Sequence, residues 1–168
     1  MNRLLKKVSS ILLISLFINI ASDAHGSVED KKTWLFTWGA RYSNPQIASA
    51  SVSIIKSETV QGSFIRVYEG NFLQLEPGVG GGKVSIGHGA VAAGEEGFYP
   101  AFFAIAIKGS YLRTWGSPWG RLPNQNFLGT EADFTYLFIK TSVGYFWRTN
   151  GSGFGDEQFI SLGAGIGF

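Results

Sequence analysis

Apolar side chains alternate with small or polar ones along the last eleven residues of the chain, QFISLGAGIGF. In an extended strand, a period of two places alternate side chains on opposite faces. One face would carry Ile160, Leu162, Ala164, Ile166 and Phe168. The other face would carry Phe159, Ser161 and glycines, so the pattern predicts a strand between an apolar environment and a narrow interior.

Seven earlier segments alternate in the same way and are bounded by turn-forming residues. They span residues 34–42, 48–56, 64–76, 83–90, 101–111, 131–138 and 142–148. The third segment is the least regular, because Glu69 and Asn71 fall on its apolar face and Phe72 on its polar face. This irregularity predicts a bulge or a strand end.

Two connections differ from simple turns. The sequence PGVGGG at Pro77–Gly82 predicts a connection or a strongly bent crossing. The longest break, residues 114–129, contains two prolines and two tryptophans. A loop of this length indicates surface exposure or a role in binding.

The first 24 residues have the features of a secretory signal peptide: three basic residues, an apolar run over residues 11–20 and a small-x-small site that ends at Ala24. We expect cleavage after Ala24, with Gly26 as the alternative, and a single domain over residues 25–168. Removal of three basic residues and Asp23 would reduce 14 basic and 12 acidic side chains to 11 of each. The balanced charge excludes an argument for nucleic-acid binding from bulk charge.

Composition indicates that the predicted strands lie in a membrane. Charged residues make up 15% of the chain, against roughly 25% in soluble domains, while aromatics reach 15% and glycines number 23. After residue 24 no apolar run is long enough for a transmembrane helix. We therefore predict an all-β fold, an antiparallel up-and-down transmembrane β-barrel of about eight strands.

Aromatic residues fall near the predicted strand ends, as an aromatic girdle at each membrane surface requires. They are Trp34, Tyr42, Phe98, Tyr99, Tyr111, Trp115, Tyr145, Trp147 and Phe168. The signal peptide, the amphipathic strands and the final aromatic together resemble small outer-membrane barrels of the OmpA transmembrane-domain and OmpX kind.

The resemblance implies a location in the outer membrane of a Gram-negative bacterium and contact with membrane lipids, including lipopolysaccharide. It also implies that Phe168 is an assembly signal for the barrel assembly machinery. With both termini in the periplasm, the loops at residues 115–128 and 150–156 would face outside the cell. The oligomeric state stays open.

Charged residues on the predicted inner faces would line the lumen: Arg41, Arg66, Glu76, Lys83, Lys108, Glu131, Asp133 and Arg148. Isolated buried ions are costly, so these side chains must be paired or hydrated. A structural ion-pair network that fills the lumen is the first interpretation, because eight strands leave an interior just wide enough for side chains. A conducting or proton-linked path is the alternative.

His88 is the weak catalytic candidate of the chain, since imidazole is a common general base. The first interpretation is a histidine at the membrane interface or at a strand end. Lipid A deacylases of the PagL type use a His, a Ser two residues later and a Glu. Here Ala90 occupies the place of that serine. Ser85 is three residues before His88 and would point to the opposite face of a strand.

Other chemistry receives little support. The glycines around Lys83 lack the Lys-Ser/Thr ending and the strand-to-helix context of a phosphate loop. Trp115, Trp119, Arg121 and Asn124 form a surface loop that could bind a glycan, or could be part of the girdle and an ordered loop. We expect no cofactor and no metal site.

The sequence therefore predicts an outer-membrane barrel with a structural or surface-interaction role. A lipid A or phospholipid-modifying enzyme, a small channel and a secreted lipocalin-like barrel are the alternatives.

Overall fold

Eight β-strands form the described part of the chain, which covers residues 28–61, 65–94, 103–116, 123–150 and 157–167. The structure is a computed structural model, and its description leaves out the side chains at residues 28–33, 58–61, 65–66 and 93–94. The strands are β1 (Val28–Ser43), β2 (Ile47–Gln61), β3 (Ile65–Pro77), β4 (Gly81–Gly94), β5 (Phe103–Thr114), β6 (Asn126–Tyr136), β7 (Ile139–Asn150) and β8 (Gln158–Gly167). No helix among the described residues is long and apolar enough to cross a membrane.

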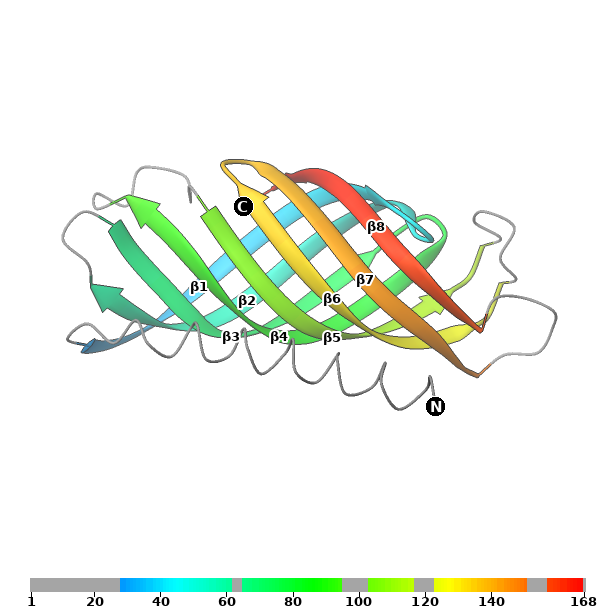
Figure 1. Cartoon of the computed structure of the whole chain (residues 1–168), viewed down its shortest axis with the longest axis horizontal. Coiled ribbons are helices and arrows are strands. Elements are labelled where there is room, and N and C mark those ends of the chain that lie inside the picture. The colour runs from blue at the N-terminus through cyan, green and yellow to red at the C-terminus, as the bar shows by residue number, and fades with distance from the viewer. Residues whose placement is uncertain (1–27, 62–64, 95–102, 117–122, 151–156, 168) are drawn as a thin grey trace, which may run out of the picture.

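Each strand pairs antiparallel with its neighbours in the sequence, and β8 pairs with β1, so the sheet closes into a barrel (Figure 1). The predicted all-β, eight-stranded barrel is confirmed. The seam between β1 and β8 is short, because it joins only Gly39–Ser43 to Gly163–Gly167.

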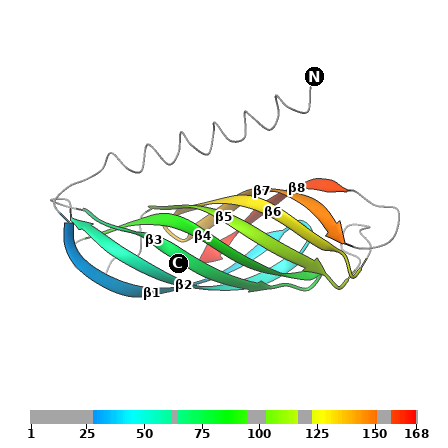
Figure 2. The same ribbon diagram turned by 90° about the horizontal axis from the view of Figure 1, so that it is seen from below.

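The strands run obliquely around the barrel (Figure 1, Figure 2). A path that starts at Thr33 of β1 and passes from each residue to its register partner on the next strand returns to β1 at Ser43. The barrel therefore has a stagger of ten residues. With eight strands, this stagger corresponds to a strand tilt of about 40°. That tilt leaves a narrow lumen.

The two ends of the barrel differ. At the loop end, β1 turns into β2 through residues 44–46 and β3 into β4 through residues 78–80. At the terminal end, where β1 begins and β8 ends, β6 joins β7 through a tight turn in which Leu137 has φ 54°. Because of the stagger, β1 to β4 extend farther than β5 to β8 at the terminal end (Figure 1).

Two local predictions need correction. β3 pairs with β2 and β4 without a register shift, so the bulge expected near Phe72 is wrong. The polar residues on its outer face are instead compensated by a contact with β4, described below. The long break is also shorter than expected, because β5 continues to Thr114 and β6 already begins at Asn126.

The predicted faces are confirmed wherever side chains are described. Outward positions carry exposed apolar side chains such as Phe36, Trp38, Ile86 and Leu162. Buried inward positions carry serines and charged residues as well as a few aromatics. This distribution is the reverse of that in a water-soluble globule, where charge faces outward.

Candidate functional site

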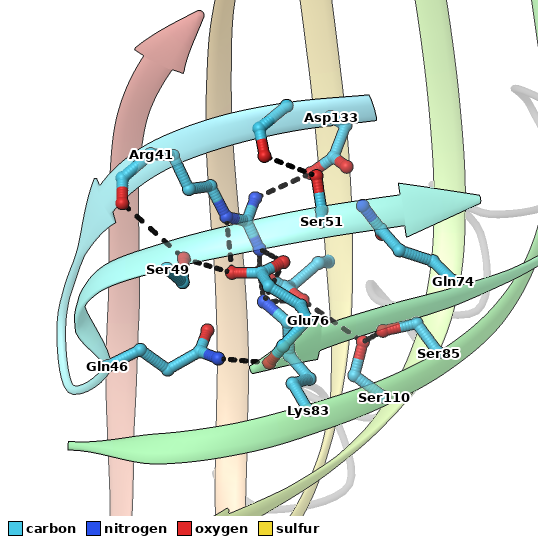
Figure 3. Close-up of polar contacts among 12 residues, drawn as sticks. Arg41, Gln46, Ser49, Ser51, Gln74, Glu76, Lys83, Ser85, Ser110 and Asp133 are labelled. Atoms are coloured by element: carbon cyan, nitrogen blue, oxygen red, sulfur yellow. Dashed lines mark hydrogen bonds and ion pairs between the residues drawn. The ribbon is translucent and has the colours of Figure 1, made fainter. Parts of the chain in front are cut away.

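The lumen contains a cluster of six charged side chains from five strands. Arg41 lies at its centre and forms a bidentate pair with Glu76 (Figure 3). Its Nε donates to Oε1 at 2.7 Å and its Nη2 to Oε2 at 2.5 Å. The guanidinium also lies 3.4 Å from Glu131 Oε1 and 3.4 Å from Asp133 Oδ1. One guanidinium on β1 thus reaches carboxylates on β3 and β6, across the lumen.

Two lysines complete the cluster. Lys83 on β4 lies 2.7 Å from Glu131 Oε2 and 3.4 Å from Glu76 Oε2. Lys108 on β5 lies 2.5 Å from Asp133 Oδ2 and 3.8 Å from Glu131 Oε2. Each carboxylate therefore contacts at least two cations.

Neutral polar groups satisfy remaining donors and acceptors of these ions. Ser49 donates to Glu76 Oε1 at 2.8 Å, and Ser110 donates to Glu131 Oε2 at 3.0 Å. Gln74 accepts a bond of 2.8 Å from Lys108 Nζ. Short inward residues such as these serines leave room for the long charged ones, which explains the polar and small residues along the inner face.

Charge balance within the cluster is complete: three cations face three carboxylates. Five of the six side chains are nearly inaccessible to solvent, and that of Asp133 is 12% exposed. Buried ions persist only when they are paired and hydrogen-bonded, and removal of one partner leaves an uncompensated charge. The arrangement forms a closed, neutral layer across the lumen.

A layer of apolar side chains lies between this cluster and the loop end. It consists of Leu112, Phe127, Phe146 and Phe159. Phe146 stacks on Phe159 with ring centroids 5.3 Å apart, and Phe127 meets Phe159 edge-on at 5.1 Å. Gly129 makes room for this layer, because a Cβ there would lie 2.5 Å from the ring of Phe146. Two layers, the ion cluster and these apolar side chains, therefore close the loop half of the lumen.

Most of the predicted lumen residues meet in one place. Arg41, Glu76, Lys83, Lys108, Glu131 and Asp133 form the cluster. Arg148 lies elsewhere, one inward position beyond Phe146 toward the loop end, beside Phe127 in the register. The side chain of Arg66 lies outside the described residues.

One lysine of the lumen was not predicted from the sequence pattern. Lys140 lies on the inner face of β7, next to Gly39 of β1, since its Cδ is 3.2 Å from a Cβ placed at Gly39. The segment 131–138 was predicted to end at Phe138 and the next strand to start at Ser142. The two-residue turn at 137–138 places Lys140 inside the strand. The alternation of Lys140, Ser142 and Gly144 is the signal that could have identified it.

His88 belongs to a second polar cluster, on the outer face of the barrel. It lies in the middle of β4 and not at a strand end. Its Nε2 is 2.8 Å from Glu69 Oε1, and its Nδ1 is 3.1 Å from Asn71 Oδ1. The two polar residues that made β3 look irregular are thus partners of one imidazole. The prediction that Ser85 and His88 lie on opposite faces of the strand is confirmed, because Ser85 is buried in the lumen.

The His88 cluster presents no nucleophile among the neighbours that the register gives it. Its cross-strand neighbours on the outer face are Asn71 and Ile107, and Ala90 follows on its own strand. Both ring nitrogens already face an oxygen of another side chain. As it stands, the cluster orients an imidazole but offers no hydroxyl for it to activate.

The described part of the surface loop is ordered by contacts with neighbouring turns. Trp115 Nε1 donates to the carbonyl oxygen of Val79 at 3.0 Å. Asn124 has φ 59°, and its backbone N–H donates to Thr114 O at 2.7 Å. Trp119 and Arg121 lie outside the described residues, as do the predicted signal peptide (residues 1–24), Phe98, Tyr99 and Phe168.

Comparison with protein-family models, curated proteins and solved structures finds no match to this chain. Among the described residues, no group of three or more His, Cys, Asp or Glu side chains could hold a metal ion.

Proposed function

We propose that the protein is a β-barrel of a bacterial outer membrane with a closed lumen and a structural or surface-interaction role. The inverted distribution of side chains carries this proposal. Aromatic and aliphatic residues are exposed on the outside, while six paired ions, five of them buried, lie inside. Water would favour the opposite arrangement, and the hydrocarbon of a bilayer favours this one.

The spacing of outward aromatic side chains supports the same conclusion. Trp34 and Tyr42 on β1 are eight residues apart, as are Phe103 and Tyr111 on β5, and all four are exposed. At 3.3 Å per residue and the tilt given above, eight residues correspond to about 20 Å along the barrel axis. The apolar band of outer-membrane barrels is ≈ 25 Å tall between two aromatic girdles.

The closed lumen argues for a role other than conduction. The ion cluster and the aromatic layer both cross the lumen, and small eight-stranded barrels have no room for a pore beside them. In this proposal the loop end faces outward, with Trp115 among the residues that contact lipopolysaccharide or a surface partner. Phe168 would serve the barrel assembly machinery during insertion.

Fractionation of cells that express the full chain tests the proposal. We expect the protein to sediment with outer membranes and to migrate differently on SDS gels before and after boiling, because a closed barrel resists the detergent when cold. A soluble periplasmic product would contradict the proposal. Planar-bilayer recordings with the same preparation should show no conductance steps, and regular steps would support the small-channel alternative.

The hydrogen-bonded Glu69–His88–Asn71 cluster is the observation that favours the enzymatic alternative. A lipid-modifying enzyme would use such an imidazole as a general base, with the nucleophile supplied by water or substrate. Lipid A and phospholipid species should be compared in cells with the wild-type chain, with His88→Ala and without the gene. Species that change between wild type and both other strains would establish an activity, and unchanged species would remove this alternative.

A further inference from the structure

The terminal half of the lumen contains a cavity of about 390 Å³. Its inward apolar residues include Leu35 on β1, Ile55 on β2 and Phe72 on β3. At its inner end it borders the ion cluster, because Asp133 also lines it. The volume is at the lower end of the range for small-molecule pockets, roughly 300–1,000 Å³.

The cavity is accessible to solvent, unlike the apolar layer in the loop half of the lumen. The inward side chains of Leu35, Ile55 and Val91 are half-buried, whereas Leu112 and Phe127 in the loop half have no exposed surface. The barrel is thus filled from the loop end as far as the ion cluster, and it is hollow from the cluster to the terminal end.

Lys140 gives the cavity its charge. It lines the cavity, and no carboxylate of the described residues lies within ion-pair distance of its ammonium. The neighbouring Asp133 is already engaged by Lys108 at 2.5 Å and Arg41 at 3.4 Å. The cluster is neutral without Lys140, so this lysine is a fourth cation facing three carboxylates. A largely buried ammonium without a counter-ion is unfavourable, and an anion placed beside it would relieve that cost.

We propose that the cavity binds a small anionic amphiphile, whose carboxylate pairs with Lys140 and whose short aliphatic chain packs against Leu35, Ile55 and Phe72. A medium-chain fatty acid has this chemistry. The charged head would lie at the inner end of the cavity and the chain would point toward the terminal end. The inference depends on the barrel and its cavity alone, so its failure would leave the proposed membrane function standing.

Octanoate, octan-1-ol and octylamine are suitable probes, because they share a chain and differ in charge. Binding is measured by titration calorimetry with the full chain in lipid nanodiscs, with empty nanodiscs as the blank for partition into lipid. We expect octanoate to bind at least about tenfold more tightly than octanol, and octylamine to bind more weakly than either. Equal affinity for all three probes, a preference for octylamine, or no octanoate binding above the blank would overturn the proposal.

Substitutions at Lys140 locate the site. Lys140→Met removes the charge but keeps most of the side-chain length, so it should weaken octanoate binding about tenfold or more, while octanol binding changes less than twofold. Lys140→Arg should retain octanoate. Lys56→Met is the matched control, since Lys56 is exposed on the outer face of β2. An equal loss in the Lys56 and Lys140 variants, or no loss in Lys140→Met, would show that the anion is not held in the cavity.

Discussion

The inner and outer faces of the same eight strands follow opposite chemical rules. Along β4, the inward Lys83 and Ser85 are buried, while the outward Val84 and Ile86, which alternate with them, are exposed. Neighbouring residues in the chain thus meet different environments within 3.3 Å of strand. The difference teaches that the surroundings of each face, and not the average composition of a strand, select its residues.

The inner face itself divides into two regions. Toward the loop end, ions and aromatic rings fill the lumen completely, and toward the terminal end a cavity remains. A packed interior tolerates neither missing nor additional atoms, whereas a cavity tolerates additions. Substitutions on the two faces, and in the two regions of the inner face, should therefore change the stability of the barrel by different amounts.

The largest effect is expected from a break in the ion cluster. Glu131→Gln removes the charge that faces Lys83 and Lys108 and leaves both cations in a nearly inaccessible site. Loss of one partner of a buried pair costs about 3–5 kcal/mol. Urea titration of the folded barrel measures the free energy of unfolding. Glu157→Gln is the control, because Glu157 is exposed at the loop end and should change stability little.

A charge introduced on the outer face should lower the free energy of unfolding by a smaller amount, and only when the barrel is in a bilayer. Ile86→Arg places a guanidinium at an exposed position between the two aromatic girdles. At mid-depth of a membrane such a change costs about 2–4 kcal/mol, whereas an exposed site in water changes by within about 0.5 kcal/mol. Unfolding is measured in phospholipid vesicles.

Val79→Arg is the matched control for Ile86→Arg. Ile86 is 69% exposed and Val79, in the turn between β3 and β4, is 68% exposed, so the two sites differ in depth and hardly in accessibility. Equal effects at both sites would show that the outer face does not contact lipid.

A single methyl group added in the packed region of the inner face should destabilise the barrel. Gly129→Ala would place a Cβ 2.5 Å from both the Phe146 ring and the carbonyl oxygen of Tyr145. Since backbone and a stacked ring must move, we expect a loss of about 1–3 kcal/mol in the same vesicle assay. A variant as stable as wild type would mean that the aromatic layer is loosely packed.

The hollow region should accept a larger addition. Ala106→Leu adds three carbon atoms at a position that lines the cavity. We expect stability within about 1 kcal/mol of wild type, because the added chain enters empty space. A loss as large as that of Gly129→Ala would contradict the difference between the two regions of the lumen.

Much of this architecture could be predicted from the sequence, because a period of two and turn residues report directly on strands and faces. Six of the lumen charges were identified from the alternation alone, since each lies in a strand of regular alternation and five of the six have a serine or glycine two residues away. Lys140 was missed because the turn before it has only two residues and the two strands merge in the pattern.

Contacts between strands far apart in the sequence could not be predicted. The pairing of Arg41 with Glu76 depends on the stagger of the barrel, which no single strand encodes. The same holds for Glu69, Asn71 and His88, where polar residues on an apolar face made β3 look irregular until their shared contact was located. The cavity forms where inward positions on several strands hold small side chains. It is therefore a property of the eight strands together.

The central claim is that the outer face contacts lipid, and site-directed spin labels measure this directly. The chain has no cysteine, so single cysteines at Ile86, Val143 and Leu162 can each carry one label, with Val79 as the loop-end reference. In native membranes we predict that the three strand labels collide often with oxygen and rarely with a water-soluble nickel chelate, and that the Val79 label shows the reverse. Frequent collisions with the nickel chelate at all four positions would contradict the account.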